Sequence, residues 1–566
     1  MKRSGSDRGR PAAAHQDRLG PPLVGLRTTR NAPTLECDPG FFGVFRHIVR
    51  HRPFAGGEFD CEEGTAMSPV TDGNSYWMAS VPATSMPVLS GDVEADVCVV
   101  GGGITGLLCA YELAEAGRSV VLLERDRIVS SVTGFTTAKL TSQHGLRYRR
   151  LTDELGAEAA RAYGRANQAA LHRIRQIVAD LAIAGDVEPL DAYVYAAEAE
   201  HIDELRSEAQ AAAEAGLPAS FTTEVPLPFA TVGAVRFADQ AQIHPRKLLV
   251  PLANALAEHG VRIFEASRAK SIERGDRWEI TCKKGVVRAE DVVVAALTPA
   301  AGVGDDLWEH MYCHQGFAVA LPLRGDGPEG VFITHERPMR SIRTIARERG
   351  RLLQVGGASY VENPNEGDTP YDDLEAWGRE HFDVGPADYR WTTQDYSTAD
   401  GVPLIGALSD PGLYIATGFG GWGMTTGGVA AAIISELITG DSTDEERDRI
   451  FDPNRELGTV DDSLISAHTS SGTDRDALEV VSALAPGQAA VVRRRGEQLG
   501  VYRKPDGELD VVSAVCTHAG CIVLWDRDHT RWNCPCHGSQ FAPDGSVIEG
   551  PAKTELADKR ALLDNG

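Results

Sequence analysis

Two short loops near the C-terminus, each carrying one cysteine and one histidine, constrain this chain more than any other feature. The first loop holds Cys516 and His518, and the second holds Cys534 and His537. Two thiolates and two imidazoles at this spacing indicate a metal centre. The set suits a [2Fe–2S] cluster with Cys516 and Cys534 on one iron and His518 and His537 on the other. A structural zinc site is the competing interpretation.

Length and charge narrow the class of protein. The chain has 566 residues, more than one hydrophobic core usually organises, so we expect roughly two to four domains. Its 56 Lys and Arg stand against 81 Asp and Glu, a formal charge of −25 that would repel nucleic acid. No apolar run reaches the roughly 18 to 20 residues of a transmembrane segment. We therefore expect a cytoplasmic protein, or one peripheral to a membrane, without a nucleic-acid partner.

The residue patterns divide the chain into four parts. Residues 1–66 begin rich in Arg, Gly and Pro and show no sustained period, so we interpret them as an unpacked leader or as a mis-assigned start, with translation beginning at Met67. Residues 67–440 alternate short apolar runs with amphipathic stretches, which is typical of βαβ units. Residues 441–476 contain few apolar residues and indicate a linker.

Residues 477–566, the fourth part, predict a small all-β module. Short apolar runs are separated there by PG and DG turns, which favour hairpins. The expected strands cover residues 479–484, 489–495, 498–504 and 508–516.

A glycine-rich turn in the α/β part indicates a dinucleotide site. The strand expected at 96–100 enters the sequence Gly101-x-Gly103-x-x-Gly106, and a helix is expected at 107–116. The glycines permit a tight turn, close approach of the backbone to a pyrophosphate, and close packing of the helix. A glycine-rich turn without a ligand is the ordinary alternative.

The residues after this turn narrow the choice of dinucleotide. Ile104 and Thr105 stand at the start of the helix, where unpaired N–H groups bind phosphates. Glu124 ends the next expected strand, where an acid accepts hydrogen bonds from the ribose hydroxyls and disfavours a 2′-phosphate. The pattern therefore favours FAD or NAD over NADP.

Over about residues 93–440 the chain resembles the glycine/D-amino-acid oxidase family of FAD-dependent oxidoreductases. The resemblance rests on the glycine-rich turn and on the stretches 130–145, 242–265, 290–297, 400–406 and 413–431. It implies that the dinucleotide is FAD, held without a covalent bond. It also implies an α/β fold, a Rossmann-like FAD-binding domain with an inserted α+β substrate domain, followed by the small all-β domain.

The same resemblance implies further flavin contacts in two stretches. In the first, the residues expected along the flavin are Thr136, Thr137, Lys139, Gln143 and His144, and His144 is the one candidate for a covalent link. In the second, a return crossing brings to the flavin Gly418, Gly420, Gly421, Trp422, Gly423 and Met424. The helix that follows can stabilise negative charge on the reduced flavin. The alternative for the first stretch is a solvated loop, and the alternative for the second is a flexible, glycine-rich helix end.

The C-terminal module resembles a Rieske domain through its two cysteine–histidine loops, GSQF at 538–541 and GPA at 550–552. The resemblance implies a disulfide between Cys521 and Cys536, as in the cytochrome bc-type members. Free buried thiols are the alternative. Ser539 supplies a hydroxyl donor, but Phe541 stands where high-potential members place a tyrosine. We therefore expect a reduction potential below that of the respiratory-chain proteins.

Together the two resemblances imply a flavin-dependent oxidoreductase. The expected reaction is dehydrogenation of an amine or amino acid at FAD, with electrons passed singly through the cluster to an external acceptor, either a protein or a quinone. The alternatives are an electron-transfer component reduced by a protein partner and a non-catalytic binding protein with structural cofactors. No catalytic residue is assigned. We interpret His244 and His314 as structural residues. We also interpret most of a group of arginines as surface charges, namely Arg340, Arg343, Arg347, Arg349 and Arg351.

Overall fold

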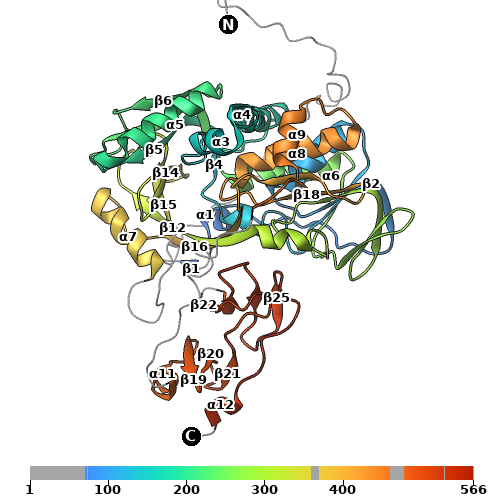
Figure 1. Cartoon of the computed structure of the whole chain (residues 1–566), viewed down its shortest axis with the longest axis vertical. Coiled ribbons are helices and arrows are strands. Elements are labelled where there is room, and N and C mark those ends of the chain that lie inside the picture. Colours follow the sequence, from blue (N-terminus) through green and yellow to red (C-terminus); the bar gives the residue numbers. More distant parts are fainter. Residues whose placement is uncertain (1–70, 73, 358–368, 459–476, 528, 565–566) are drawn as a thin grey trace, which may run out of the picture. The chain divides into compact units, whose positions relative to one another are not determined.

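Figure 1 shows a computed structural model of the chain, which describes residues 71–72, 74–357, 369–458, 477–527 and 529–564. The expected leader, residues 1–66, lies outside the described residues, and so does the alternative start at Met67. Within the described ranges, no helix combines the length and the apolar character needed to cross a membrane.

The predicted dinucleotide unit is a βαβ unit in the first sheet. β2 (Val93–Val100) leads into α2 (Ile104–Glu115), and β3 (Val120–Leu123) pairs parallel with β2. The sheet has the order β17-β18-β11-β2-β3-β8, with β10 on β11 and β9 on β10. Its remaining strands are β8 (Arg262–Phe264), β9 (Ser271–Arg274), β10 (Trp278–Thr281), β11 (Val286–Val294), β17 (Leu404–Ala407) and β18 (Leu413–Thr417).

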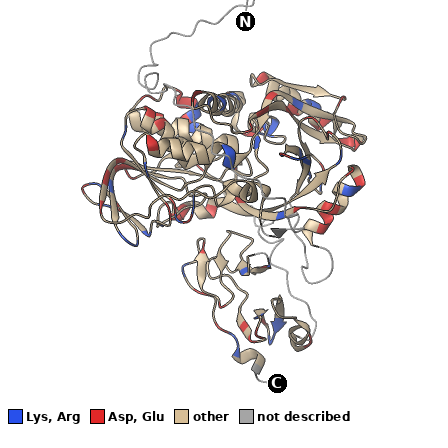
Figure 2. Ribbon diagram, turned by 180° about the vertical axis from the view of Figure 1, so that it is seen from behind, with Lys and Arg blue, Asp and Glu red and all other residues tan. Residues whose placement is uncertain are grey.

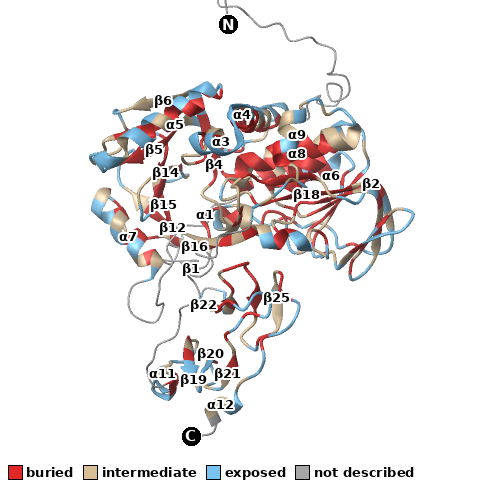
Figure 3. Cartoon of the chain, viewed as in Figure 1, coloured by how far each residue is buried: buried red, intermediate tan, exposed pale blue. Residues whose placement is uncertain are grey.

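Helices bury the central strands of this sheet. α2 packs against α8 (Gly423–Thr439) and contacts α6 (Pro245–Glu258). In Figure 3, buried residues run along much of α8 and through β18. Every residue of β3 is buried. Strands that are buried on both faces read as continuous apolar runs, which is why they stand out in the sequence.

The second sheet has ten strands in the order β1-β16-β12-β15-β14-β13-β5-β7-β4, with β6 on β7. Most neighbours are antiparallel, while β1 runs parallel to β16 and β13 to β5. The strands are β1 (Thr71–Asp72), β4 (Lys139–Leu140), β5 (Glu188–Ala196), β6 (Ala219–Thr222), β7 (Gly233–Gln242), β12 (Met311–Leu323), β13 (Val331–Thr334), β14 (Ser341–Ala346), β15 (Arg351–Gly357) and β16 (Tyr389–Thr398).

The other helices of this region carry charged residues on their outer surfaces, where Figure 2 shows both signs interspersed. The α-helices are α1 (Tyr76–Ser80), α3 (Tyr148–Leu155), α4 (Ala157–Asp180), α5 (Ile202–Glu214) and α7 (Pro370–His381). The 3-10 helices are η2 (Val132–Phe135), η3 (Ala199–His201) and η4 (Asp305–His310).

Part of the segment expected as a linker, 441–476, is folded. α9 (Glu445–Phe451) buries Ile450 and Phe451 in the core of the α/β region, and the ring of Phe451 stacks on Tyr163 of α4 at 5.7 Å between centroids. These two apolar side chains hold the segment onto the preceding domain. The remainder of the expected linker, 459–476, lies outside the described residues.

The C-terminal domain has two small antiparallel sheets, as expected. One contains β19 (Ala489–Arg494), β20 (Glu497–Arg503) and β21 (Leu509–Ser513). The other contains β22 (Leu524–Asp526), β23 (Arg531–Asn533), β24 (Gln540–Phe541) and β25 (Val547–Glu549).

The prediction of a strand at 479–484 is wrong, because this segment is largely helical. α11 (Ala477–Ala483) buries Ala477 and Val481, which lie one helical turn apart, and packs on β19. A short apolar run fits either period, so only packing decides it. A further short helix, α12 (Ala561–Asp564), lies near the end of the domain.

Candidate functional site

A cavity of about 780 Å³ is lined by residues of both large sheets. Its walls include both predicted glycine-rich turns, as well as stretches at 131–137 and 295–302. Both apolar and polar residues line the cavity, and its volume suits a large ligand such as a dinucleotide.

Two glycines shape the β2–α2 turn. Gly101 has a φ of +117°, and a Cβ there would lie 2.3 Å from the carbonyl oxygen of Ala295. A Cβ at Gly106 would lie 1.9 Å from the carbonyl oxygen of Gly101. The turn therefore requires both glycines. Ile104 and Thr105 begin α2 and line the cavity, where their position suits a pyrophosphate.

Glu124 lies in the wall of the cavity beside this turn. Its carboxylate accepts hydrogen bonds from the N–H of Gly102 at 2.7 Å and of Asp126 at 2.8 Å. Burial raises the pKa of Glu124, while these two N–H groups oppose the shift. Each carboxylate oxygen has further lone pairs, so Glu124 can also accept hydrogen bonds from ribose hydroxyls.

The residues of the return crossing from Phe419 to Met424 also line the cavity. Gly420 and Gly421 have φ of +60° and +86°, and the N–H of Gly421 donates to Oδ2 of Asp395 at 2.6 Å. α8 then begins at Gly423, and its N-cap residue, Trp422, makes no side-chain cap. A helix start placed in this way can stabilise negative charge on a bound ligand.

Most of the residues expected to contact FAD do line the cavity. They are Gly101, Gly103, Ile104, Thr105, Glu124, Thr136, Thr137, Lys139, Gly420, Gly421, Trp422, Gly423 and Met424. The structure does not place Gly106, Gly418, Gln143 or His144 among the lining residues. The two glycines shape the turns, because a Cβ at Gly418 would lie 2.7 Å from Cγ2 of Thr398.

His144 lies behind the cavity wall. Its Nδ1 is 2.7 Å from the hydroxyl of Tyr163 and its Nε2 is 2.9 Å from the carbonyl oxygen of Thr141. Its ring stacks on Trp422 at 4.6 Å between centroids. Both nitrogens are occupied, so His144 supports the lining residue Trp422. The Gln143 amide donates to the carbonyl oxygen of Gly145.

A cross-strand pair lines the cavity although the sequence indicated neither residue as part of the site, since His314 was interpreted as structural and Asp395 was not singled out. His314 of β12 lies directly opposite Asp395 of β16, and both line the cavity. Burial lowers the pKa of His314 and raises the pKa of Asp395, and each charge opposes the other's shift. The Nε2 of His314 is 3.1 Å from the hydroxyl of Ser397. No local motif announces such a pair, because strand pairing brings it together.

Lys139 is a buried cation in the cavity wall. Burial, with the charge of Arg343, lowers the pKa of Lys139 to about 7, and its ammonium contacts the hydroxyl of Ser341. The interpretation of Arg340 and Arg343 as surface charges is wrong, since each is only 3% exposed. Arg343 donates to three backbone carbonyls, and Arg340 pairs with Asp373, so both have structural partners.

The two cysteine–histidine loops meet in the C-terminal domain. The imidazole rings of His518 and His537 lie 4.8 Å apart between centroids. A hydrogen bond with the Cys534 thiol lowers the pKa of Cys516 to about 6. The Nδ1 of His537 is buried and has no hydrogen-bond partner among the described residues. Two sulfurs and two imidazoles therefore face one another, as a [2Fe–2S] cluster requires.

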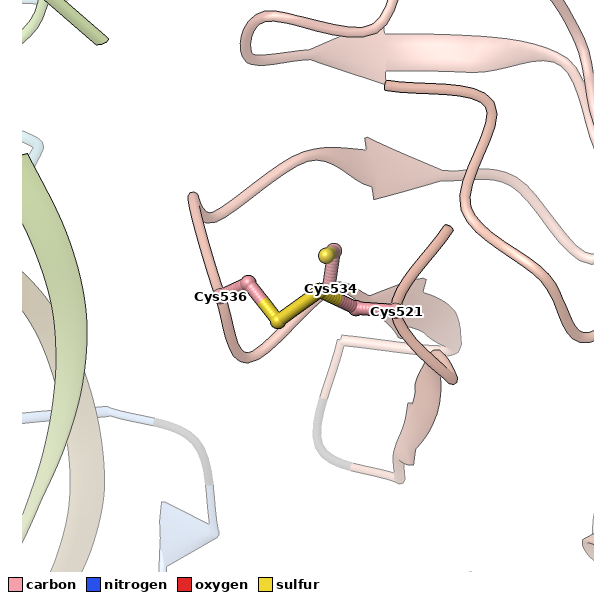
Figure 4. Close-up of side chains that lie close together, drawn as sticks. All are labelled: Cys521, Cys534 and Cys536. Atoms are coloured by element: carbon pink, nitrogen blue, oxygen red, sulfur yellow. A yellow bond between two sulfur atoms is a disulfide. The ribbon is translucent and has the colours of Figure 1, made fainter. Parts of the chain in front are cut away.

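The disulfide between Cys521 and Cys536 is confirmed, and the alternative of free thiols is wrong. Figure 4 shows the bond beside the Cys534 side chain. The Cα atoms of Cys521 and Cys536 lie 6.5 Å apart. The disulfide ties the loop of His518 to the loop of His537. Ser539 is fully buried and hydrogen-bonds to Cys516, while Phe541 packs in the domain core.

Comparison with known proteins identifies both halves of the chain. Residues 96–437 match the family described as FAD dependent oxidoreductase, and residues 477–559 match the Rieske [2Fe-2S] domain. The Rieske 2Fe-2S iron-sulfur protein YhfW of Bacillus subtilis (strain 168) is 32% identical over 489 residues, which cover 84% of this chain and 96% of that protein.

Two further similarities concern the larger part of the chain. Gamma-glutamylputrescine oxidoreductase of Escherichia coli (strain K12) is 26% identical over 386 residues, covering 65% of this chain and 89% of that protein. The crystal structure of glycine oxidase from Geobacillus kaustophilus superposes with a TM-score of 0.52 at 19% identity, covering 65% of this chain and all of the other. This last similarity supports the fold.

Proposed function

Because the chain belongs to the FAD dependent oxidoreductase family and carries a Rieske [2Fe-2S] domain, we propose that it dehydrogenates an amine or amino acid and passes the electrons singly to an external acceptor. One observation carries the proposal. The loop of His537 is hydrogen-bonded to β12, a strand that lines the FAD cavity. The N–H of Cys313 in β12 donates to the carbonyl oxygen of Cys536 in the loop at 3.0 Å. A two-electron site and a one-electron site thus adjoin.

The residues of the cavity would hold FAD in three places. The start of α2 would bind the pyrophosphate, Glu124 would bind the ribose, and the start of α8 would face the flavin end. When bound, FAD accepts a hydride from carbon, and the cluster accepts single electrons. Asp395 fixes the return turn through Gly421, and the apolar side chains of Phe317, Met339 and Trp391 also line the cavity.

Two observations support an amine or amino acid as substrate. The relative from Escherichia coli is named for gamma-glutamylputrescine, an amine that also carries a carboxylate. In this chain, the buried ammonium of Lys139 faces the cavity and favours an anionic group in the ligand.

The surface of the C-terminal domain supports an external acceptor. His537 is 7% exposed, whereas His518 and its neighbours Thr517, Ala519 and Gly520 are exposed. An acceptor would therefore approach the predicted cluster on the side of His518.

An anaerobic reduction screen tests the proposal. Primary and secondary amines, amino acids and gamma-glutamylputrescine are added to the holoprotein, and the visible absorption of flavin and cluster is followed. We expect bleaching of both chromophores, and their recovery on addition of ferricyanide. Bleaching only with a reduced protein partner would favour the electron-transfer component instead. Bleaching in neither case would favour structural cofactors.

A further inference from the structure

The strand pair β12–β16 forms one wall of the FAD cavity, and residues 547–550 of the C-terminal domain line another part of it. Along β16, Trp391, Thr393 and Asp395 line the cavity, whereas Gln394 and Tyr396 do not. This is the alternation of a β-strand, whose successive side chains point to opposite faces. Gln394 and Tyr396 therefore present the outer face of the same wall.

The outer face of the wall is bonded to the loop that carries His537. The side-chain amide of Gln394 donates to the carbonyl oxygen of Gly538 at 3.2 Å and accepts from the amide of Gln540 at 3.2 Å. It also donates to the hydroxyl of Tyr396 at 2.8 Å. Gly538 directly follows His537, so these bonds hold the backbone next to a predicted cluster ligand.

The contact at Gly538 is closely packed. A Cβ at this position would lie 1.9 Å from both Nε2 of Gln394 and the hydroxyl oxygen of Tyr396. The φ of +69° at Gly538 also favours glycine. Tyr396 is only 3% exposed, and burial raises its pKa well above the usual value, so its hydroxyl remains protonated. The loop and the wall therefore fit one another without intervening side chains.

Ion pairs reinforce the same contact at its edge. Arg125, which lines the cavity, pairs with Glu549 of β25, and Nζ of Lys553 lies 3.4 Å from Oδ2 of Asp305 in η4. Both pairs join the FAD-binding region to the cluster domain. The hydrogen bonds at Gln394 are thus part of a wider interface that keeps the two sites adjacent.

We propose that Gln394 and Tyr396 are positioning residues that hold the His537 loop against the β12–β16 wall, so that electrons cross this wall within one chain. The inference rests on the proposed function. Dehydrogenation removes a hydride from the substrate carbon and a proton from its nitrogen, and the two electrons of the hydride cross one after the other. Each electron would reduce one ferric ion of the cluster to ferrous, and the external one-electron acceptor would remove that electron before the second one arrives. The protons go to solvent.

The test starts electron transfer without a substrate. A laser flash in the presence of oxalate reduces the flavin of the anaerobic holoprotein, and the absorption of the oxidised cluster is then followed in time. For Gln394→Leu we expect the cluster to be reduced about tenfold more slowly, because the loss of two interface hydrogen bonds leaves the loop less often seated against the wall. Tyr396→Phe should slow it less. Gln315→Leu is the matched control, because the Gln315 amide bonds to Thr392 of β16.

Three controls separate positioning from general damage. The flavin spectrum, the cluster's EPR signal and its potential should be the same in Gln394→Leu as in the unaltered protein, while only the transfer rate falls. The rate should not depend on protein concentration. A Gln394→Leu rate equal to the unaltered rate, or a rate proportional to concentration, would overturn the proposal. If the flash experiment gives the expected rates while no amine bleaches the flavin, the positioning role of Gln394 and Tyr396 is supported and the proposed substrate class is wrong.

Discussion

The N–H of Cys313 donates a hydrogen bond to the carbonyl oxygen of Cys536, with 3.0 Å between nitrogen and oxygen. Cys313 belongs to a strand of the cavity wall, and Cys536 belongs to both the ligand loop and the disulfide. The two cofactor sites, far apart in the sequence, are thus joined through the backbone.

Gly106→Ala should abolish FAD binding without loss of the cluster. The added methyl would lie 1.9 Å from a backbone oxygen of the turn, so α2 must move away from the pyrophosphate position. The purified variant should lack flavin absorption and keep the cluster's EPR signal. Gly117→Ala is the control, since it meets no atom within 4 Å and strains only a positive φ, at a cost of about 1 kcal/mol. Full flavin content in Gly106→Ala would contradict the assignment of this turn.

Lys139 should make anion binding depend on pH. Because burial lowers the pKa of Lys139 to about 7, its positive charge is lost as the pH rises through that value. The affinity for acetate, measured through perturbation of the flavin spectrum, should fall about tenfold per pH unit above this pKa. In Lys139→Met the affinity should be weak at every pH. A variant that keeps the unaltered pH profile would exclude Lys139 as the anion's partner.

Removal of the disulfide should destabilise the cluster domain. The bond closes a loop with a sequence separation of 15, for which chain entropy predicts about 3 kcal/mol. The double variant Cys521→Ser with Cys536→Ser should lose its cluster absorption at a lower denaturant concentration. Dithiothreitol should lower the midpoint of the unaltered protein and leave that of the variant unchanged. Equal midpoints of variant and unaltered protein would show that the bond adds no stability.

Ser539→Ala should lower the cluster's potential. The Ser539 hydroxyl hydrogen-bonds to Cys516, and its loss corresponds to roughly 60–130 mV if the bond is worth that of a charged acceptor. Ser546→Ala, in an exposed turn where the hydroxyl bonds to Asp544, is the control.

Redox titration of the unaltered protein should already give a potential below that of the respiratory-chain Rieske proteins, because Phe541 lacks a hydroxyl. A higher value would refute this interpretation.

The sequence predicted those parts of the sites that depend on local spacing. The turn at Gly101, the start of α2, and the ligands Cys516 and His518 each lie within a few residues of their partners. The disulfide was predicted by resemblance to a known domain, and the structure contains it. Local patterns of this kind persist because the backbone geometry itself requires particular residue types.

The residues that the sequence did not reveal depend on strand pairing. His314 meets Asp395, and Gln394 meets Gly538, only because β12 and β16 pair in one register and present opposite faces to the cavity and to the loop. Neither His314 nor Gln394 lies in a sequence motif. The helix α11 was missed for a related reason, since a short apolar run does not distinguish a strand from a helix until its packing partner is known.

The most direct test of the account is anaerobic rapid mixing of the holoprotein with gamma-glutamylputrescine, or with the best amine from the screen, while flavin and cluster absorption are recorded together. We expect that the flavin is bleached first, that cluster absorption then falls at a rate independent of protein concentration, and that ferricyanide restores both. A flavin that is fully bleached beside a cluster that stays oxidised would contradict it.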